Sequence, residues 1–345
     1  MARVVMADDG IAFDGHSLSE RPLGGAESAF ISLAEALAAR GHDVAIRNHC
    51  PRPGEVNGVD WAPLKDGLPE TCDMYIANRG NRLIASMPGA TRTVFWIHNP
   101  ANYLLKWRYL SPLWRLRPAI VFSGRYHANS YPGWAPSGER IEIPYGISEV
   151  FRTATPPDAP PAPRALYTSN PLRSLDWLLE LWAVLIRPAV PDAELHVFSG
   201  PATDGAFGDA RSAQMAPILD KARALGSQGV VLRAPIPQED LARELGAARV
   251  LAYRGDPGET FCRAVGEAQA AGVPAVVQNI GCGAERVVDR ETGFVAADDR
   301  AFADATIALL SDDDLWRRQS AQAIACQRRW GWPEAAVAFE RLIPS

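Results

Sequence analysis

The sequence predicts an α/β protein made of two doubly wound parallel-sheet domains, and three observations lead to this fold class. The chain has 345 residues, which is long for one core and natural for two domains of about 150 to 180 residues. Short β-branched segments alternate with helical patterns, as in parallel strands joined by crossover helices. A segment with five prolines, residues 152–164, suits a stiff linker between the halves.

The first half opens as a doubly wound sheet. Between its first two strands, residues Ala26–Ala39 repeat apolar side chains at helical spacing until Gly41 ends the helix. The strands expected here are Arg3–Ala7, Asp43–Asn48, Met74–Asn78, Thr93–His98, Ala119–Ser123 and Arg140–Pro144.

The same pattern restarts after the prolines. The tail from Asp312 to Ile343 is expected to be helical, with an interruption where Gly331 and Pro333 occur together. The strands expected in this half are Ala165–Thr168, Glu194–Phe198, Val230–Ala234, Arg249–Tyr253, Ala275–Gln278 and Gly293–Ala296.

Charge and composition exclude several classes of protein. The net charge of −5 provides no basic footprint for DNA or RNA, so we expect no nucleic-acid partner. The five cysteines are odd in number and scattered without a C-x-x-C pair, which indicates reduced thiols in a cytoplasmic protein. No signal-peptide stretch opens the chain, and no run reaches the ~18 apolar residues of a membrane span.

Two glycines precede the first helix. Gly24 and Gly25 follow a long loop, and backbone N–H groups at such a turn can approach a phosphate without side-chain obstruction. The alternative is a plain helix start, because the full dinucleotide or P-loop fingerprint is missing. The residues alone leave both interpretations open.

A second pattern follows the strand expected at Arg249–Tyr253. Glu259 stands just before a helix expected from Phe261 to Ala270, and Glu267 lies two turns along it. Open α/β sheets bind ligands at the carboxyl ends of their strands. Glu259 could therefore accept hydrogen bonds from sugar hydroxyls, and Glu267 could accept them from the two hydroxyls of a ribose. The alternative is an acidic N-cap followed by a solvent-exposed helical glutamate.

The neighbours of these glutamates resemble a known signature. Residues 259–277, the turn at 281–285 and Thr292–Val295 are similar, in order, to the donor-site motif of retaining GT-B glycosyltransferases of family four, the glycosyl transferases group 1. Gly24–Glu27 resembles the family's G-G-x-E turn. Ile143–Ile147 resembles its I-P-N-G-I/V segment, so the resemblance covers both halves of the chain.

The resemblance implies an arrangement of domains. Two Rossmann-like domains would face a central cleft, with an acceptor-side domain at residues 1–151, the linker at 152–164 and a nucleotide-sugar donor domain at 165–330. The last helix, within 331–345, would pack back on the first domain.

The resemblance also implies a donor site. Glu259 would hold the transferred sugar, Glu267 the ribose, and Arg173 the diphosphate. Thr260 and Cys262 stand where the family has glycines, which should narrow the room beside the sugar, and Ser174 replaces another family glycine. The implied donor-binding residues are Gly24, Gly25, Arg173, Glu259, Thr260, Phe261, Cys262, Arg263 and Glu267.

His98 is the candidate from the first half. It ends a strand that we expect to be buried, and it resembles the family's H-N-P element near the transferred sugar and acceptor. It could orient an acceptor hydroxyl or bind the sugar, whereas the alternative is a structural histidine. With Arg173 and Glu259 it completes the set expected to be catalytic.

Residues 102–117 interleave aromatic residues with Lys106, Arg108, Arg115 and Arg117. Such stretches can lie on the inner face of an anionic membrane, where enzymes glycosylate lipid-linked acceptors. Pro112 is expected to break the helix and so weaken a continuous amphipathic face. The alternative is a solvated loop and helix that cover the first sheet.

Together these features predict a retaining glycosyltransferase that moves a sugar from a nucleoside diphosphate to an acceptor hydroxyl, in glycan, polysaccharide or glycolipid synthesis. We expect no cofactor and no metal, because no D-x-D triplet suggests a metal site. A sugar-nucleotide epimerase, a glycosyl phosphorylase and a non-catalytic sugar-nucleotide binding protein share the same pattern and are the alternatives.

Overall fold

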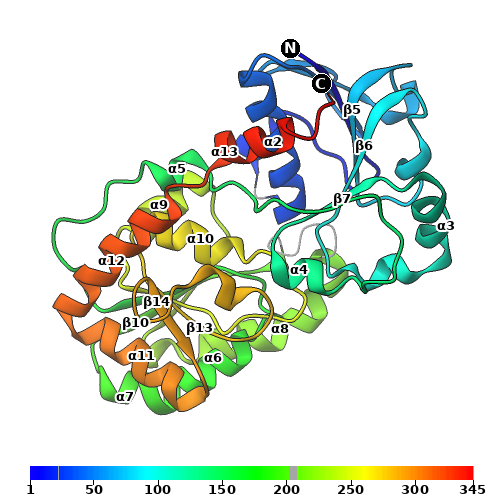
Figure 1. The fold of residues 1–345 in the computed structure, drawn as a ribbon. Helices are drawn as coiled ribbons and strands as arrows, with labels where there is room; N and C mark the ends of the chain where they lie inside the picture. Colours follow the sequence, from blue (N-terminus) through cyan, green and yellow to red (C-terminus); the bar gives the residue numbers. More distant parts are fainter. Residues whose placement is uncertain (22, 202–207, 345) are drawn as a thin grey trace. The chain divides into compact units, whose positions relative to one another are not determined.

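The computed structural model describes residues 1–21, 23–201 and 208–344 as two α/β units (Figure 1). One unit consists of residues 1–21, 25–146 and 332–345, and the other of residues 22–24 and 147–331. The sequence places the boundary within 152–164, whereas the structure places it after Gly146. The proline-rich segment belongs to the second unit because it bonds there: Arg249 Nε donates to the carbonyl of Pro161 at 2.6 Å, and Glu194 N donates to that of Pro163 at 3.0 Å.

The first unit is built on an eight-stranded sheet in the order β3-β4-β2-β1-β5-β6-β7-β8. All neighbours are parallel except β3 and β4. Its strands are β1 (Arg3–Asp8), β2 (Asp43–Asn48), β3 (Gly54–Val56), β4 (Val59–Pro63), β5 (Cys72–Asn78), β6 (Ala90–Trp96), β7 (Ala119–Phe122) and β8 (Arg140–Glu142). Its helices are α1 (Ser17–Glu20), α2 (Gly25–Ala39), η1 (Leu64–Asp66), η2 (Leu83–Ala85), η3 (Ala101–Leu105), α3 (Trp107–Leu116), α4 (Arg125–Asn129) and α13 (Trp332–Glu340).

The second unit has a six-stranded, all-parallel sheet in the order β11-β10-β9-β12-β13-β14. Its strands are β9 (Arg164–Tyr167), β10 (Glu194–Phe198), β11 (Val230–Arg233), β12 (Val250–Ala252), β13 (Ala275–Gln278) and β14 (Gly293–Ala296). Its helices are α5 (Glu149–Arg152), α6 (Leu175–Leu181), η4 (Trp182–Ile186), α7 (Arg187–Ala189), α8 (Gly208–Ala224), η6 (Gly226–Gln228), α9 (Gln238–Leu245), α10 (Arg263–Ala270), η7 (Gly283–Arg286), α11 (Asp299–Ser311) and α12 (Asp313–Gln327).

Each sheet reverses its direction of growth once. In the first unit the reversal lies between β1 and β5, and in the second it lies between β9 and β12. The loops that leave neighbouring strands at such a switch point run to opposite faces of the sheet and open a crevice at the carboxyl ends, where doubly wound sheets bind ligands. The two reversals therefore mark where functional side chains should gather.

Two helices differ from expectation or join distant parts of the chain. Pro112 lies inside α3 and does not break it, since the helix runs unbroken from Trp107 to Leu116. Helix α13 packs against α2, so the end of the chain completes the first unit (Figure 1). Among the residues that the structure describes, no helix combines the length and the apolar character that crossing a bilayer requires.

Candidate active site

The switch point of the second unit brings together the two residues expected to act on the donor. Strands β9 and β12 are neighbours, and all of their residues are buried except Arg164, the first residue of β9. Arg173 lies in the turn after β9 and Glu259 in the loop after β12. Since both strands end at the same edge of the sheet, the two side chains meet there.

Arg173 and Glu259 form an ion pair with one acceptor unused. Nη1 of Arg173 donates to Oε1 of Glu259 at 2.5 Å, whereas Oε2 of Glu259 is buried without a hydrogen-bond partner. The Glu259 side chain is 8% exposed and the Arg173 side chain 37%. Burial lowers the pKa of Arg173, but the Glu259 carboxylate raises it, and the net shift is upward. The pair thus presents an unfilled buried acceptor beside a cation that still reaches solvent.

The turn that carries Arg173 is held by Tyr167 at the end of β9. The Tyr167 hydroxyl lies 2.6 Å from the carbonyl oxygen of Asn170 and 2.8 Å from that of Arg173, and Oδ1 of Asn170 accepts from the Leu172 N–H at 2.9 Å. Ser174 then has a φ of 61° and ψ of 19°, the left-handed region, as the N-cap of α6. The glycine that Ser174 replaces in the family motif would have occupied this conformation without strain.

Helix α10 begins beside Glu259 in a similar way. Cys262 is its N-cap with a φ of 58° and ψ of 63°, again left-handed, and its side chain is buried. Burial and the nearby Glu259 carboxylate raise the pKa of the Cys262 thiol, so the side chain is a neutral thiol that fills space. Thr260 and Phe261 are also buried, and the Phe261 ring packs under the guanidinium of Arg286 at 4.4 Å. The first-turn amides of α10, which lack acceptors within the helix, follow directly.

Glu267 is a buried residue of α10, which excludes the solvent-exposed alternative. Its side chain is 10% exposed, and Oε1 accepts from Nε of Arg263 at 3.0 Å and from Nη2 at 2.8 Å. Arg263 was expected among the donor-binding residues. Its side chain also fixes the carboxylate of Glu267 one turn further along the helix.

The switch point of the first unit holds a chain of buried polar contacts around His98. Asp8 ends β1 and Asn78 ends β5, and Nδ2 of Asn78 donates to Oδ2 of Asp8 at 2.5 Å. Nε2 of His98 lies 2.5 Å from Oδ1 of Asn78, and Nδ1 lies 2.5 Å from the Tyr145 hydroxyl. An amide oxygen only accepts, so Nε2 carries the proton and Nδ1 accepts from the hydroxyl.

His98 is a neutral imidazole with both ring nitrogens occupied. Burial, with smaller contributions from Arg79 and His127, holds its pKa well below the usual value. His98 therefore orients the end of β6 and holds Tyr145, which stands at the asparagine position of the family's I-P-N-G-I/V segment.

Arg79 joins this chain to the glycine turn. Its Nη2 donates to Oε1 of Glu27 at 2.8 Å and its Nε to Oδ2 of Asp8 at 3.1 Å. Burial raises the pKa of Asp8, although Arg79 opposes the shift. Glu27 is the third residue of α2, which begins at Gly25, so the glycine turn lies at the edge of the same network.

The sequence did not single out Asp8, Asn78, Arg79 or Tyr145. Asp8 and Asn78 are the last residues of strands next to each other in the sheet, which was a usable signal only once the strand order was known. Arg79 has a φ of 49°, a conformation rare for a residue with a side chain, and no sequence pattern predicts it.

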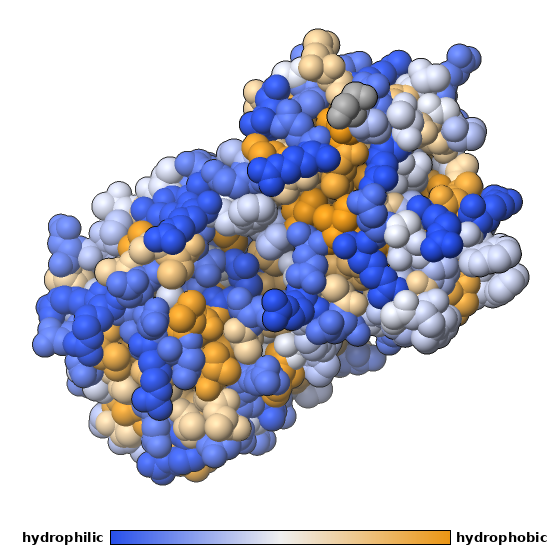
Figure 2. Space-filling view, viewed as in Figure 1, coloured by the Kyte–Doolittle hydropathy of each residue, from blue (hydrophilic) through white to orange (hydrophobic). Residues whose placement is uncertain are grey.

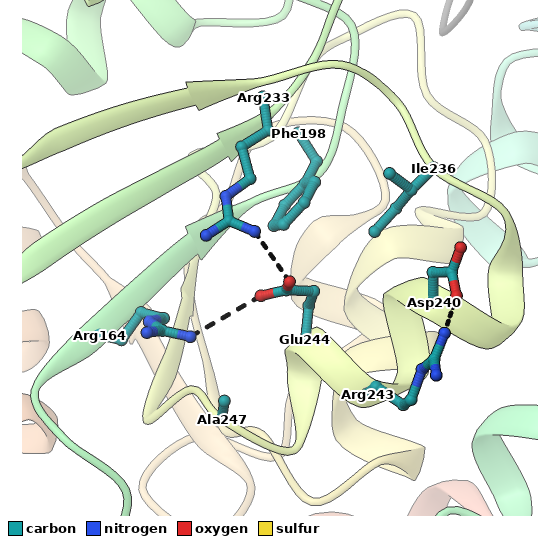
Figure 3. Close-up of a pocket in the computed structure, with 8 residues that line it drawn as sticks. All are labelled: Arg164, Phe198, Arg233, Ile236, Asp240, Arg243, Glu244 and Ala247. Atoms are coloured by element: carbon teal, nitrogen blue, oxygen red, sulfur yellow. Dashed lines mark hydrogen bonds and ion pairs between the residues drawn. The ribbon is translucent and has the colours of Figure 1, made fainter.

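Two other features of the described residues concern metal ligands and a pocket away from this site. Within residues 1–21, 23–201 and 208–344, no three His, Cys, Asp or Glu side chains group as metal ligands. A pocket of about 470 Å³ lies against α9 (Figure 3), where Glu244 pairs with Arg233 at 2.9 Å and with Arg164 at 3.7 Å. Its lining residues are Arg164, Phe198, Arg233, Ile236, Asp240, Arg243, Glu244 and Ala247, none of which was expected in the donor site.

Comparison with known proteins finds similarity to glycosyltransferases. Residues 163–312 match the family Glycosyl transferases group 1. The chain is 43% identical over 75 residues to the D-inositol 3-phosphate glycosyltransferase of Xylanimonas cellulosilytica, a match that spans 21% of this chain and 18% of that protein.

Solved structures show the fold of the whole chain. Sucrose-phosphate synthase from Thermosynechococcus elongatus superposes with a TM-score of 0.74 at 16% identity, over 99% of this chain and 98% of that one. Anabaena HepE in complex with UDP and glucose gives a TM-score of 0.71 at 13% identity, over 99% of both chains. WaaG, a glycosyltransferase of lipopolysaccharide biosynthesis, gives 0.67 at 14% identity over 99% of this chain and 100% of that one.

Proposed function

We propose that this chain, which has the GT-B fold and carries a glycosyl transferases group 1 domain at residues 163–312, is a glycosyltransferase that uses a UDP-sugar. The observation that carries the proposal is the Arg173–Glu259 pair at the β9/β12 switch point, with Oε2 of Glu259 buried and without a partner. A sugar hydroxyl is a donor that would satisfy this oxygen. The uridine diphosphate is inferred from HepE, which was solved with UDP and with UDP-glucose.

The residues of the second unit divide the donor between them. Arg173 and the first amides of α10 bind the diphosphate, where positive charge and a helix N-terminus favour an anion. Glu259 holds the sugar, with Thr260, Phe261 and Cys262 around it. Glu267, kept in place by Arg263, accepts the ribose hydroxyls.

The transfer breaks the bond between the anomeric carbon and the diphosphate oxygen. The acceptor oxygen forms the new bond on the same face of the sugar, and its proton passes to the leaving diphosphate, so the anomeric configuration is retained. Arg173 and the amides stabilise the charge that develops on the diphosphate, which requires no metal ion and no cofactor. The neutral His98 fixes the position of Tyr145 through a hydrogen bond. It does not itself take the proton of the acceptor hydroxyl.

Replacement of the central pair tests the proposal. Arg173→Met and Glu259→Gln should each lower the rate of sugar transfer from a UDP-sugar by about 100-fold, because each removes a charged contact to the donor in the transition state. UDP should raise the melting temperature of the wild-type protein more than GDP or ADP does. The Glu259→Gln protein should still respond to UDP, since Glu259 is assigned to the sugar.

A matched pair in the same unit provides the control. Arg233→Met and Glu244→Gln remove an ion pair of similar length in the pocket of Figure 3, and both should leave transfer unchanged. The proposal fails if no nucleotide shifts the melting temperature, or if Glu259→Gln transfers sugar at the wild-type rate. Proton NMR of the first product formed should show the anomeric configuration of the donor, and an inverted product would exclude retention.

A further inference from the structure

The first unit contains a long stretch without acidic residues. Residues 74–138 include eight arginines and lysines and no aspartate or glutamate, although the whole chain has a net charge of −5. Four of these cations are Lys106, Arg108, Arg115 and Arg117, which lie in α3 or next to its ends. Within the part of the chain that the structure describes, none of the four makes an ion pair with a carboxylate. Their positive charge is therefore not neutralised by the protein itself.

The exposed tryptophans of the described residues gather in the same stretch. Trp107 and Trp114 of α3 are 78% and 74% exposed, and Trp134 is 72% exposed. Leu116, at the end of α3, is 45% exposed. Large aromatic side chains are normally buried, so three tryptophans left in solvent within 28 residues of the chain indicate a surface that contacts something.

Helix α3 separates its apolar core face from this exposed face. Tyr109 and Leu113 are one turn apart, buried, and part of the hydrophobic core of the unit. Trp107 and Trp114 are seven residues apart and therefore lie on nearly the same side of the helix. In Figure 2 the surface where Figure 1 places α3 mixes strongly hydrophilic and intermediate residues with a few hydrophobic ones.

The segment that carries Trp134 is fixed to the end of α3. Nε of Arg117 donates to the carbonyl oxygen of Ser137 at 3.3 Å, and Gly138 N donates to that of Pro118 at 2.9 Å. The end of α3 and the segment at 134–138 therefore form one continuous structure, although about twenty residues separate Trp134 from Trp114. We name the exposed side chains of Lys106, Trp107, Arg108, Trp114, Arg115, Leu116, Arg117 and Trp134 the basic aromatic face.

We propose that the basic aromatic face docks this protein on an anionic lipid bilayer. Tryptophan is the side chain that best suits the boundary between lipid and water, because its ring is apolar and its N–H needs a polar partner. The four cations lie beside the tryptophans, where phosphate headgroups would neutralise them, and each is expected to raise partitioning about fivefold. A two-fold contact between copies of this chain would instead place the cations of the face against themselves.

Docking would place the first unit at the lipid surface. Helix α3 follows the loop that contains His98, with only η3 between them, so the acceptor side of the proposed reaction would work next to the bilayer. The docking itself does not require the proposed transfer reaction, and the two are tested by separate measurements.

Flotation of the full chain with lipid vesicles tests this proposal. The wild-type protein should float with vesicles of phosphatidylcholine containing about 30% phosphatidylglycerol and not with phosphatidylcholine alone, and about 0.5 M salt should weaken the binding at least tenfold. Trp107→Ser with Trp114→Ser, and separately Lys106→Glu with Arg115→Glu, should each lower binding to the anionic vesicles at least tenfold.

The control makes the same change of charge elsewhere. Arg318→Glu with Arg329→Glu alters two exposed residues of the second unit and should leave vesicle binding within twofold of wild type. A rise in melting temperature on addition of UDP reports that each variant is folded. If the wild-type protein shows no such rise, the proposed donor site is wrong, and the vesicle-binding result still stands by itself.

Three results would overturn the proposal. The first is equal binding of the wild-type protein to both kinds of vesicle, and the second is an equal loss in the control variant. The third is self-association in sedimentation that the tryptophan variant abolishes while vesicle binding stays unchanged, which would assign the face to a second copy of the chain.

Discussion

At the scale of single residues, His127 shows how the fold depends on a neutral imidazole. Its Nδ1 accepts from the Ser123 N–H at 3.1 Å, and its Nε2–H donates to the carbonyl of Asn99 at 2.8 Å. Burial lowers the pKa of His127 to about 4, although the Asn99 carbonyl opposes the shift. Protonation would convert the accepting nitrogen into a donor that faces another donor.

This requirement predicts a pH dependence of stability. Below the unfolded-state pKa of about 6.5, His127 binds a proton in the unfolded chain but stays neutral in the folded chain. Stability that is present at pH 7 is therefore lost as the pH falls toward 4. His127 should contribute a loss of about 1.4 kcal/mol per pH unit across that window. Urea unfolding of His127→Gln between pH 7 and pH 5 should show a shallower slope than the wild-type protein.

The exposed His49 serves as the control, since His49→Gln should keep the wild-type slope. His98 is also buried with a lowered pKa, so the His127→Gln protein should retain part of the dependence. Identical slopes for the wild-type and His127→Gln proteins would contradict the account of His127.

Single residues also show where the sequence was informative about the site. Ser174 and Cys262 were recognisable as departures from family glycines, and both have a left-handed backbone with φ of 61° and 58°. The sequence analysis used these departures only to expect less room beside the sugar, and it made no prediction of the left-handed backbone. The sequence did not predict the contact between Arg173 and Glu259, because 86 residues separate them and only the order of β9 and β12 brings them together.

At the scale of elements, Gly293 sets how β14 lies against β13. Its φ is 150°, and a Cβ at this position would lie 2.0 Å from the carbonyl oxygen of Ala275 in the partner strand. Gly293 is the first residue of β14, and this strand pairs with β13 from Ala275 to Gln278. The glycine of the family's T-G segment is therefore required by the packing of two backbones.

Gly293→Ala should lower the free energy of unfolding by about 2 kcal/mol or more, because the methyl group clashes with backbone that cannot move aside. The measurement is the melting temperature, with Gly226→Ala as the matched control, since a Cβ at Gly226 has no neighbour within 4 Å. A Gly293→Ala protein as stable as Gly226→Ala would mean that the edge of the sheet adapts without cost.

Most strands were predictable from the sequence and one hairpin was overlooked. Buried parallel strands are short β-branched runs, and the expected strands agree with β2, β10, β13 and β14 in both bounds. The hairpin of β3 and β4 was missed because its strands are only three and five residues long. Its signal was present in Asn57-Gly58, whose φ values of 52° and 75° suit a tight two-residue turn.

At the scale of the whole molecule, the order of the chain did not reveal which parts belong together. Proline content suggested a boundary at 152–164, but composition reports only local stiffness, and the hydrogen bonds of Pro161 and Pro163 place that segment in the second unit. The return of α13 to the first unit was expected from resemblance alone. No local pattern predicts a contact between residues 298 to 300 positions apart, such as those that join Glu340 to His42 and Arg40.

The end of the chain should therefore control the stability of the first unit. Phe339 is 1% exposed and packs edge-on against Trp96 of β6 at 5.2 Å, while Glu340 accepts from Arg40 Nε at 2.8 Å. Phe339→Ala should cost about 3 to 5 kcal/mol because it leaves a cavity beside a central strand. Urea unfolding followed by tryptophan fluorescence measures the loss, and Arg341→Ala, at an exposed position two residues further on, should cost less than about 0.5 kcal/mol. If both variants unfold at the same urea concentration as wild type, α13 does not support the first unit.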